Sequence, residues 1–175
     1  ASLVAEDVEG RVGDPHPVRL AELSEATVTG SHGQLCRILG NLVDNGQRHA
    51  ASAVRVSLRR EGGEAVLEVA DDGTGVPEAD RERIFQRFVR LDDARSRDDG
   101  GAGLGLAIAR DVAARHGGSL TVGAAPEGGA LFALRLPVVE GGDPAEPEES
   151  GVEESGDEER GNEERGTEPS GSGGR

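Results

Sequence analysis

The sequence contains no lysine, and all 19 of its basic residues are arginine. This absence excludes phosphate-loop NTPases, eukaryotic-type protein kinases and Schiff-base enzymes, which all depend on a lysine side chain. Tryptophan, tyrosine and methionine are also missing, and phenylalanine occurs three times. With so few aromatic rings to stack on bases, the chain is not expected to bind nucleic acids by stacking.

Cysteine and long apolar runs are equally scarce. The single cysteine, Cys36, cannot form an internal disulfide or a cysteine-based zinc site. Its place within an apolar helical pattern predicts a buried side chain. No apolar run approaches the ~20 residues of a membrane span, and no basic-then-apolar leader is visible. We therefore expect a soluble, cytoplasmic domain without direct membrane contact, which is compatible with a parent protein anchored in a membrane.

Negative charge is concentrated at the C-terminal end. The formal net charge is −15 at pH 7, and residues 139–175 alone carry 13 acidic and 3 basic side chains. An acidic balance argues against general nucleic-acid binding. Glycine, glutamate, serine and proline dominate this segment, and too little apolar surface is available to offset the entropy of ordering. We expect residues 139–175 to be a disordered acidic tail, either a solvating segment or a docking segment.

The apolar periodicity predicts one α/β domain over residues 26–138. Five apolar residues at helical spacing predict a helix from the N-cap Ser31 to about His49. Alternating apolar residues predict two local pairs of strands, and a second helix follows Gly105. Such elements pack as a two-layer α/β sandwich (α+β), with helices on one face of a mixed, mostly antiparallel sheet. Residues 1–25 are weakly patterned, which predicts a linker or the remnant of an upstream domain. The strands are expected at residues 54–59, 65–70, 119–123 and 130–136.

Four short motifs carry the chemistry. In the first, Asn41 and Asn45 are four residues apart, so both carboxamides project from one side of the predicted helix. A carboxamide oxygen is a neutral hard ligand, and two of them suit a Mg²⁺ ion that is already bound to phosphates. The alternative interpretation is a pair of solvated asparagines on a helix surface.

The second motif, Asp71-x-Gly73-x-Gly75, directly follows a predicted strand. It places a carboxylate acceptor beside a backbone bend that lets a flat ligand approach closely. An adenine amino group is a suitable donor to this carboxylate. The alternative is a simple loop from a strand to a helix.

Two further motifs follow along the chain. Phe85 and Phe88 are predicted to anchor a short helix, opened by Pro77, to the core, with Arg90 facing phosphate. Residues 101–105 then form a Gly-x-Gly-x-Gly bend that enters a helix, and the N–H groups at such a helix start bind anions. This bend is neither a dinucleotide-binding fingerprint, whose last glycine is missing, nor a phosphate loop, since no lysine follows.

In this order and spacing, the four motifs resemble the N, G1, F and G2 boxes of the catalytic ATP-binding domain of bacterial two-component sensor histidine kinases. The match covers residues 28–137, and it is specific because the four motifs occur together. The resemblance implies the Bergerat ATP-binding fold, with ATP and Mg²⁺ as cofactors. The chain departs from the family at Gly46, where the family prefers alanine, and at residues 31–33, which replace an acidic start of the helix.

The resemblance also implies a role for each motif. Asn45, together with Asn41, would hold Mg²⁺ on the ATP phosphates. The implied catalytic residues are Asn41, Asn45 and Arg48. Asp71 would bind the adenine amino group, and residues 91–100 would form a flexible lid. The implied ATP-binding residues are Asn45, Arg48, His49, Asp71, Gly73, Gly75, Val76, Arg90, Gly101, Ala102, Gly103, Leu104, Gly105 and Leu106.

The implied activity is transfer of the ATP γ-phosphoryl group to a histidine. None of the four histidines in the sequence has the context of a phosphoacceptor. We therefore expect the accepting histidine on a separate histidine-containing dimerisation domain, in the parent chain or in another chain, with a response regulator as the next partner. Two alternatives stay open: a stand-alone serine kinase of the anti-sigma-factor type, which the missing phosphoacceptor favours, and a non-catalytic nucleotide-binding interaction module.

Overall fold

The computed structural model describes residues 2–11, 16–91 and 103–139, so the predicted acidic tail lies outside the described residues after Val139. No helix in the described ranges is both long and apolar enough to cross a membrane. The elements are α1 (Ser2–Glu9), β1 (Val18–Leu23), α2 (His32–His49), β2 (Val54–Glu61), β3 (Glu64–Asp71), the 3₁₀-helices η1 (Glu78–Asp80) and η2 (Arg83–Phe85), α3 (Gly105–Arg115), β4 (Ser119–Ala124) and β5 (Ala130–Pro137).

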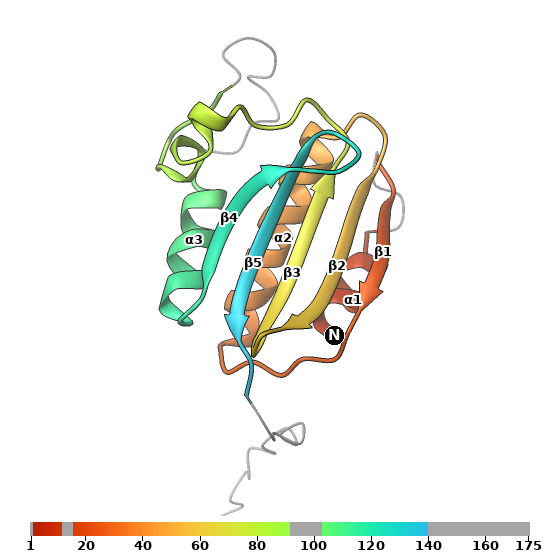
Figure 1. Cartoon of the computed structure of the whole chain (residues 1–175), viewed down its shortest axis with the longest axis vertical. Coiled ribbons are helices and arrows are strands. Elements are labelled where there is room, and N and C mark those ends of the chain that lie inside the picture. The colour runs from red at the N-terminus through yellow and green to blue at the C-terminus, as the bar shows by residue number, and fades with distance from the viewer. Residues whose placement is uncertain (1, 12–15, 92–102, 140–175) are drawn as a thin grey trace, which may run out of the picture. The chain divides into compact units, whose positions relative to one another are not determined.

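The strands form one sheet in the order β1-β2-β3-β5-β4. β1 pairs with β2 in parallel, whereas the other three pairs are antiparallel. The α-helices lie on one face of this sheet, and the opposite face is open (Figure 1). The predicted two-layer α/β sandwich with a mixed, mostly antiparallel sheet is therefore confirmed.

Helix α2 supplies much of the apolar layer that packs on the sheet. Its buried stripe of Ile38, Leu39, Leu42 and Val43 is at most 1% exposed, as the helical spacing predicts. Burying side chains of this size contributes roughly 1.5–3 kcal/mol each. The buried residues that the strands contribute to the same cluster include Val54, Val56, Val69, Leu120 and Phe132.

The sequence predicts Cys36 in this buried stripe, and that prediction is wrong. Cys36 is half-buried, and its Sγ atom lies 3.4 Å from Nε2 of His32, one turn earlier on α2. The residue stands beside the stripe and not within it. An apolar helical segment therefore does not by itself say which of its small residues face the core.

The N-terminal segment contributes to both layers. The structure places α1 and β1 within residues 1–25, for which the sequence predicts a linker or the remnant of an upstream domain. Val4 of α1 is 5% exposed and belongs to the core cluster. β1 joins the sheet beside β2, with Val18 opposite Val54. The side chains of β1 are mostly exposed, as suits an edge strand, and the alternation of its apolar residues breaks at a register shift between Leu20 and Leu23.

The segment after β3 differs from the single short helix that the sequence predicts. It forms η1 and η2, and the chain becomes extended at Gln86. Phe85 is buried and meets the ring of Phe132 edge-on, with ring centroids 6.5 Å apart. Phe88 is 73% exposed and has a φ of 66°. The prediction that Phe88 anchors the core is wrong, because two residues three apart share a face only while the helix continues.

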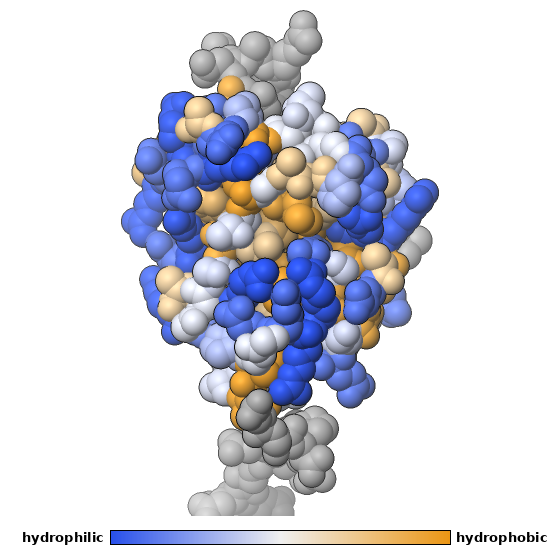
Figure 2. All heavy atoms as spheres, in the orientation of Figure 1, coloured by the Kyte–Doolittle hydropathy of each residue, from blue (hydrophilic) through white to orange (hydrophobic). Residues whose placement is uncertain are grey.

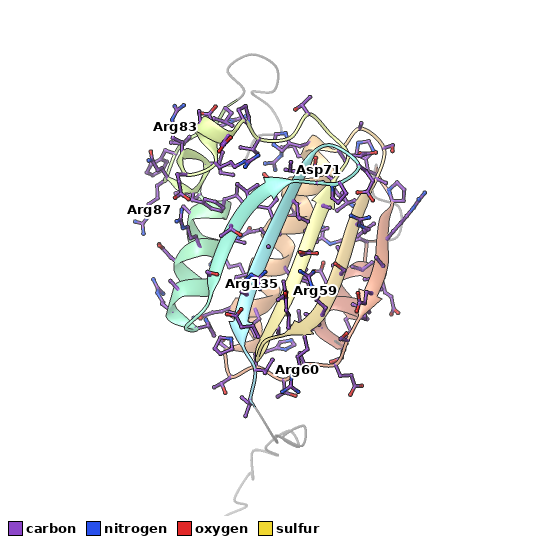
Figure 3. The ribbon with its side chains drawn as sticks, viewed as in Figure 1. Arg59, Arg60, Asp71, Arg83, Arg87 and Arg135 are labelled. Atoms are coloured by element: carbon purple, nitrogen blue, oxygen red, sulfur yellow. The ribbon has the colours of Figure 1, made fainter. Side chains whose placement is uncertain are left out.

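Ion pairs cover part of the open face of the sheet. Hydrophilic residues gather in the lower half of this face and apolar residues show above them (Figure 2). Arg59 lies 2.6 Å from Glu68, and Arg135 lies 3.4 Å from Glu64 (Figure 3). Val66 pairs in register with both arginines and is 0% exposed. We infer that the aliphatic stems of the two arginines shield this valine from water.

Candidate functional site

A pocket of about 430 Å³ brings parts of the four sequence motifs together. Its lining residues come from the C-terminal half of α2, the end of β3 and the start of α3. The ends of these three elements lie at the same end of the sheet (Figure 1). A pocket of this size is typical of small-molecule sites. The residues that line it are Asn41, Asp44, Asn45, Arg48, His49, Asp71, Thr74, Gly75, Val76, Ile84, Val89, Arg90, Leu91, Gly103, Leu104, Gly105, Leu106, Ala130 and Phe132.

Asp71 provides a fixed acceptor on the wall of the pocket. It ends β3 (Figure 3) and is 4% exposed, the one buried polar or charged residue within the described ranges. Its Oδ1 atom accepts hydrogen bonds from the backbone N–H groups of Gly73 (2.9 Å) and Ala130 (3.2 Å). An ionised carboxylate has acceptor sites on both oxygens. Because both bonds end on Oδ1, Oδ2 is the atom left to accept a donor from a ligand.

The glycines of the second motif are required by the protein backbone itself. A Cβ on Gly73 would lie 1.9 Å from the carbonyl oxygen of His49. Gly75 has a φ of 73°, and a Cβ there would lie 2.8 Å from the carbonyl oxygen of Gly129. Gly75 lines the pocket, whereas Gly73 does not. Gly73 therefore shapes the site by letting the loop after β3 touch the end of α2.

Asp72 fastens the same loop to the turn between α2 and β2, a role that the sequence did not reveal. Its Oδ1 accepts the backbone N–H groups of Ala51 (2.8 Å), Ser52 (2.9 Å) and Ala53 (3.2 Å). The Ser52 hydroxyl also donates to Oδ2. This hydroxyl and the backbone donors hold the pKa of Asp72 well below its usual range. The donors precede Asp72 by 19 to 21 residues, so no local sequence signal marks the contact.

The two asparagines of the first motif line the pocket from α2, as their spacing predicts. Both are half-buried. Nδ2 of Asn41 donates to the carbonyl oxygen of Gly105 at 3.2 Å and so ties α2 to the start of α3. No hydrogen bond is shown for Asn45 among the described residues, so its carboxamide is available to a ligand.

The donor set is compatible with Mg²⁺ that arrives on phosphates. The described ranges hold no group of three or more histidine, cysteine, aspartate or glutamate side chains that could cage a metal ion. The carboxamide oxygens of Asn41 and Asn45 are neutral ligands. Mg²⁺ usually keeps several waters and takes few protein ligands when substrate phosphates supply the rest. The residues present therefore fit a Mg²⁺ ion that is bound to phosphates, and they provide too few ligands for a Mg²⁺ ion without phosphates.

Basic residues and a helix start line the same pocket. Arg48 and His49 lie in the last turn of α2, and Arg90 follows η2. Helix α3 begins at Gly105 without a side-chain cap, so the first N–H groups of the helix are open to an anion. Gly103 has a φ of 68°, and its carbonyl oxygen accepts the N–H of Phe88 at 3.0 Å. The predicted site residues Gly101 and Ala102, and the expected lid after Leu91, lie outside the described residues.

Apolar side chains also line the pocket. Val76 and Leu106, both predicted, lie there. Sequence reasoning missed several others, because a residue such as Phe132 has the pattern of an ordinary inward strand position. Nothing in the local sequence distinguishes a core side chain from one that also faces a ligand. The missed lining residues are Asp44, Thr74, Ile84, Val89, Leu91, Ala130 and Phe132.

Comparison with known proteins gives matches across this region. The family described as Histidine kinase-, DNA gyrase B-, and HSP90-like ATPase matches residues 30–140. Sensor-like histidine kinase SenX3 of Mycolicibacterium smegmatis is 43% identical over 112 residues, which make up 63% of this chain and 29% of SenX3. This chain spans less than a third of the length of such relatives.

Two solved structures are similar in fold and in sequence. Full-length ShkA in complex with AMPPNP has a TM-score of 0.67 and 31% identity, over 79% of this chain and 30% of that chain. The mycobacterial sensor histidine kinase MprB has a TM-score of 0.65 and 31% identity, over 78% of this chain and 94% of that chain. The likeness to MprB therefore extends over nearly all of that solved chain.

Proposed function

The chain belongs to the family of histidine kinase-, DNA gyrase B- and HSP90-like ATPases, and from this premise we propose that it is the ATP-binding catalytic domain of a two-component sensor histidine kinase. The observation that carries the proposal is the buried carboxylate of Asp71 in the pocket, with Oδ1 bound by backbone donors and Oδ2 left for a ligand. An adenine amino group is the donor that we assign to Oδ2. Apolar residues around it suit a flat base.

The phosphates would lie between the end of α2 and the start of α3. Arg48 and Arg90 supply positive charge, and the first N–H groups of α3 supply donors. ShkA, a similar protein, was solved with AMPPNP, an ATP analogue. Mg²⁺, when bound, neutralises charge that develops on the phosphates. Asn45, with Oδ1 of Asn41, would hold this ion.

The proposed reaction moves the γ-phosphoryl group of ATP to a histidine outside this chain. A ring nitrogen of that histidine attacks the γ-phosphorus, the bond to the bridging oxygen breaks, and ADP leaves. The chain's own residues position the phosphates and stabilise their charge, which is how most phosphoryl-transfer proteins act. The partners would be a histidine-containing dimerisation domain, in the parent chain or in another chain, and through it a response regulator.

The serine-kinase alternative is not favoured, because the similar proteins are sensor histidine kinases. A non-catalytic module would keep the pocket and lose the transfer. The two functions are separated by supplying the domain with a histidine-containing dimerisation domain from a similar kinase and labelled ATP. Acid-labile, base-stable label on that domain is expected for a histidine kinase, and no label would contradict the proposed transfer.

Binding is tested first by calorimetric titration of ATP, with and without Mg²⁺. We expect a dissociation constant of micromolar to submillimolar order, about −8 to −5 kcal/mol. Asp71→Asn should weaken the binding of ATP and of adenosine alike, because the adenine amino group loses its carboxylate acceptor. Asn45→Ala should remove the dependence of ATP affinity on Mg²⁺ and leave adenosine binding unchanged. Unchanged ATP affinity in both variants would overturn the assignment of the site.

A further inference from the structure

Arg11 joins the N-terminal helix to the wall of the nucleotide pocket. Its Nε atom lies 2.7 Å from Asp7 of α1, and its NH1 atom lies 2.6 Å from Oδ1 of Asp44 on α2. The Arg11 side chain is 17% exposed, whereas that of Asp44 is 59% exposed. The pKa of Arg11 is raised despite its burial, because both carboxylates bind it. Arg11 is thus a well-covered cation whose second partner, Asp44, lines the pocket.

Asp44 has a second basic residue within reach along its own helix. Arg48 is four residues later on α2 and lines the same pocket. An acidic residue four positions before a basic one is the favoured orientation for an ion pair on a helix. No such pair is shown in the part of the chain that the structure describes, and Asp44 is bound to Arg11 instead. The guanidinium of Arg48 remains available to a ligand.

We propose that Arg11 is a positioning residue for nucleotide binding: by holding Asp44, it keeps this carboxylate from pairing with Arg48 and offsets its negative charge beside the phosphates. This inference rests on the proposed function, in which Arg48 meets the ATP phosphates. Arg11 touches no substrate and acts through Asp44. The N-terminal segment, which lies outside the four motifs, then contributes to the affinity of the pocket for anions.

The proposal predicts an effect that grows with the charge of the ligand. In an Arg11→Ala variant, Asp44 is released beside Asn45, where it repels phosphate and competes for Arg48. The loss should be greatest for ATP, smaller for ADP and absent for adenosine, and it should shrink at high salt because exposed charges are screened. If Arg11 served only to dock α1, Arg11→Ala should weaken the binding of all three ligands alike.

The test is a set of calorimetric titrations with ATP, ADP and adenosine on five proteins. They are the wild type, Arg11→Ala, Asp44→Asn, the double variant and Arg59→Ala. Arg59 is the matched control, since it also binds a carboxylate, that of Glu68, but its partner lies on the open face of the sheet. We expect Arg11→Ala to weaken ATP binding about fivefold or more. In the double variant, Asp44→Asn should restore the affinity for ATP. Asp44→Asn alone should not weaken ATP binding, and Arg59→Ala should leave it unchanged.

Two outcomes would overturn the proposal. One is unchanged ATP affinity in a folded Arg11→Ala protein. The other is an equal loss for ATP and adenosine that Asp44→Asn does not restore. Asp44→Asn keeps the proposal testable even where Arg11→Ala fails to fold, because weaker ATP binding in that single variant contradicts it. A wild type that binds no ATP would instead refute the proposed function, which separates the two failures.

Discussion

Gly73 lies against the carbonyl oxygen of His49 so closely that a Cβ at residue 73 would stand 1.9 Å from it. Neither atom belongs to a flexible side chain, so Gly73→Ala forces the loop after β3 away from the end of α2. Because this loop begins at Asp71, we expect Gly73→Ala to weaken adenosine and ATP binding at least tenfold. The substitution should also lower the free energy of unfolding by more than about 2 kcal/mol.

A control for this prediction is Gly123→Ala on β4, where a Cβ would meet nothing within 4 Å. This variant should bind nucleotide like the wild type. Calorimetric titration and urea unfolding of both variants provide the measurements. Normal adenosine affinity in Gly73→Ala would show that the loop can move without disturbing the pocket, contrary to our expectation.

The two phenylalanines of the third motif should differ sharply in their effect on stability. Phe85 packs on Phe132 and also receives the guanidinium of Arg110 at 4.8 Å from its ring centroid. Phe85→Ala is expected to lower the free energy of unfolding by about 3–5 kcal/mol. Phe88→Ala should change it by no more than about 0.5 kcal/mol, since Phe88 is largely in water. Urea unfolding of the pair decides the matter, and similar losses in both variants would contradict the structure.

Asp72 should make the stability of the protein depend on pH in the acidic range. Its folded-state pKa is lowered by Ser52 and neighbouring backbone donors, whereas an unfolded aspartate titrates near ~3.9. A lowered folded pKa stabilises the protein above the unfolded pKa, and this contribution is lost as pH falls through the folded pKa. The melting temperatures of wild type and Asp72→Asn should therefore differ at pH 7 and begin to converge as the pH falls below about 4. A difference that stays constant between pH 7 and pH 3 would be evidence against the role of this carboxylate.

The elements that the sequence predicted well are those whose apolar residues repeat with a clear period. The stripe of α2 and the alternation in β2 and β5 arise from burial on one side, and the structure confirms them. The motif residues Asn41, Asn45 and Asp71 also meet in one pocket, because α2 packs beside β3. Periodicity and motif spacing were therefore sufficient to predict these three elements and the motif residues that share the pocket.

What the sequence did not reveal depends on contacts between distant segments. β1 pairs with β2 but buries little side-chain surface, and the alternation of its apolar residues breaks after Leu20. The bonds of Asp72 and the ion pair between Arg11 and Asp44 link residues about 20 and 33 positions apart. Phe88 was misplaced because a spacing of three is informative only within a continuous helix. For Asp72 and Arg11, the deciding partner lies in a segment that is distant along the chain.

Gly46 is a position at which α2 lies close against β2. A Cβ there would lie 3.1 and 3.3 Å from the two Cγ atoms of Val54, which is 0% exposed. Alanine gains up to about 1 kcal/mol of helix propensity, yet crowding a packed core costs about 1–3 kcal/mol. We therefore expect Gly46→Ala to destabilise the protein, whereas Gly33→Ala on the same helix, with no atom within 4 Å of its Cβ, should not. In a Val54→Ala background the crowding is gone, so there Gly46→Ala should be stabilising in urea unfolding. If Gly46→Ala stabilises the wild-type protein instead, Val54 can yield, and the close approach of α2 to β2 does not require glycine.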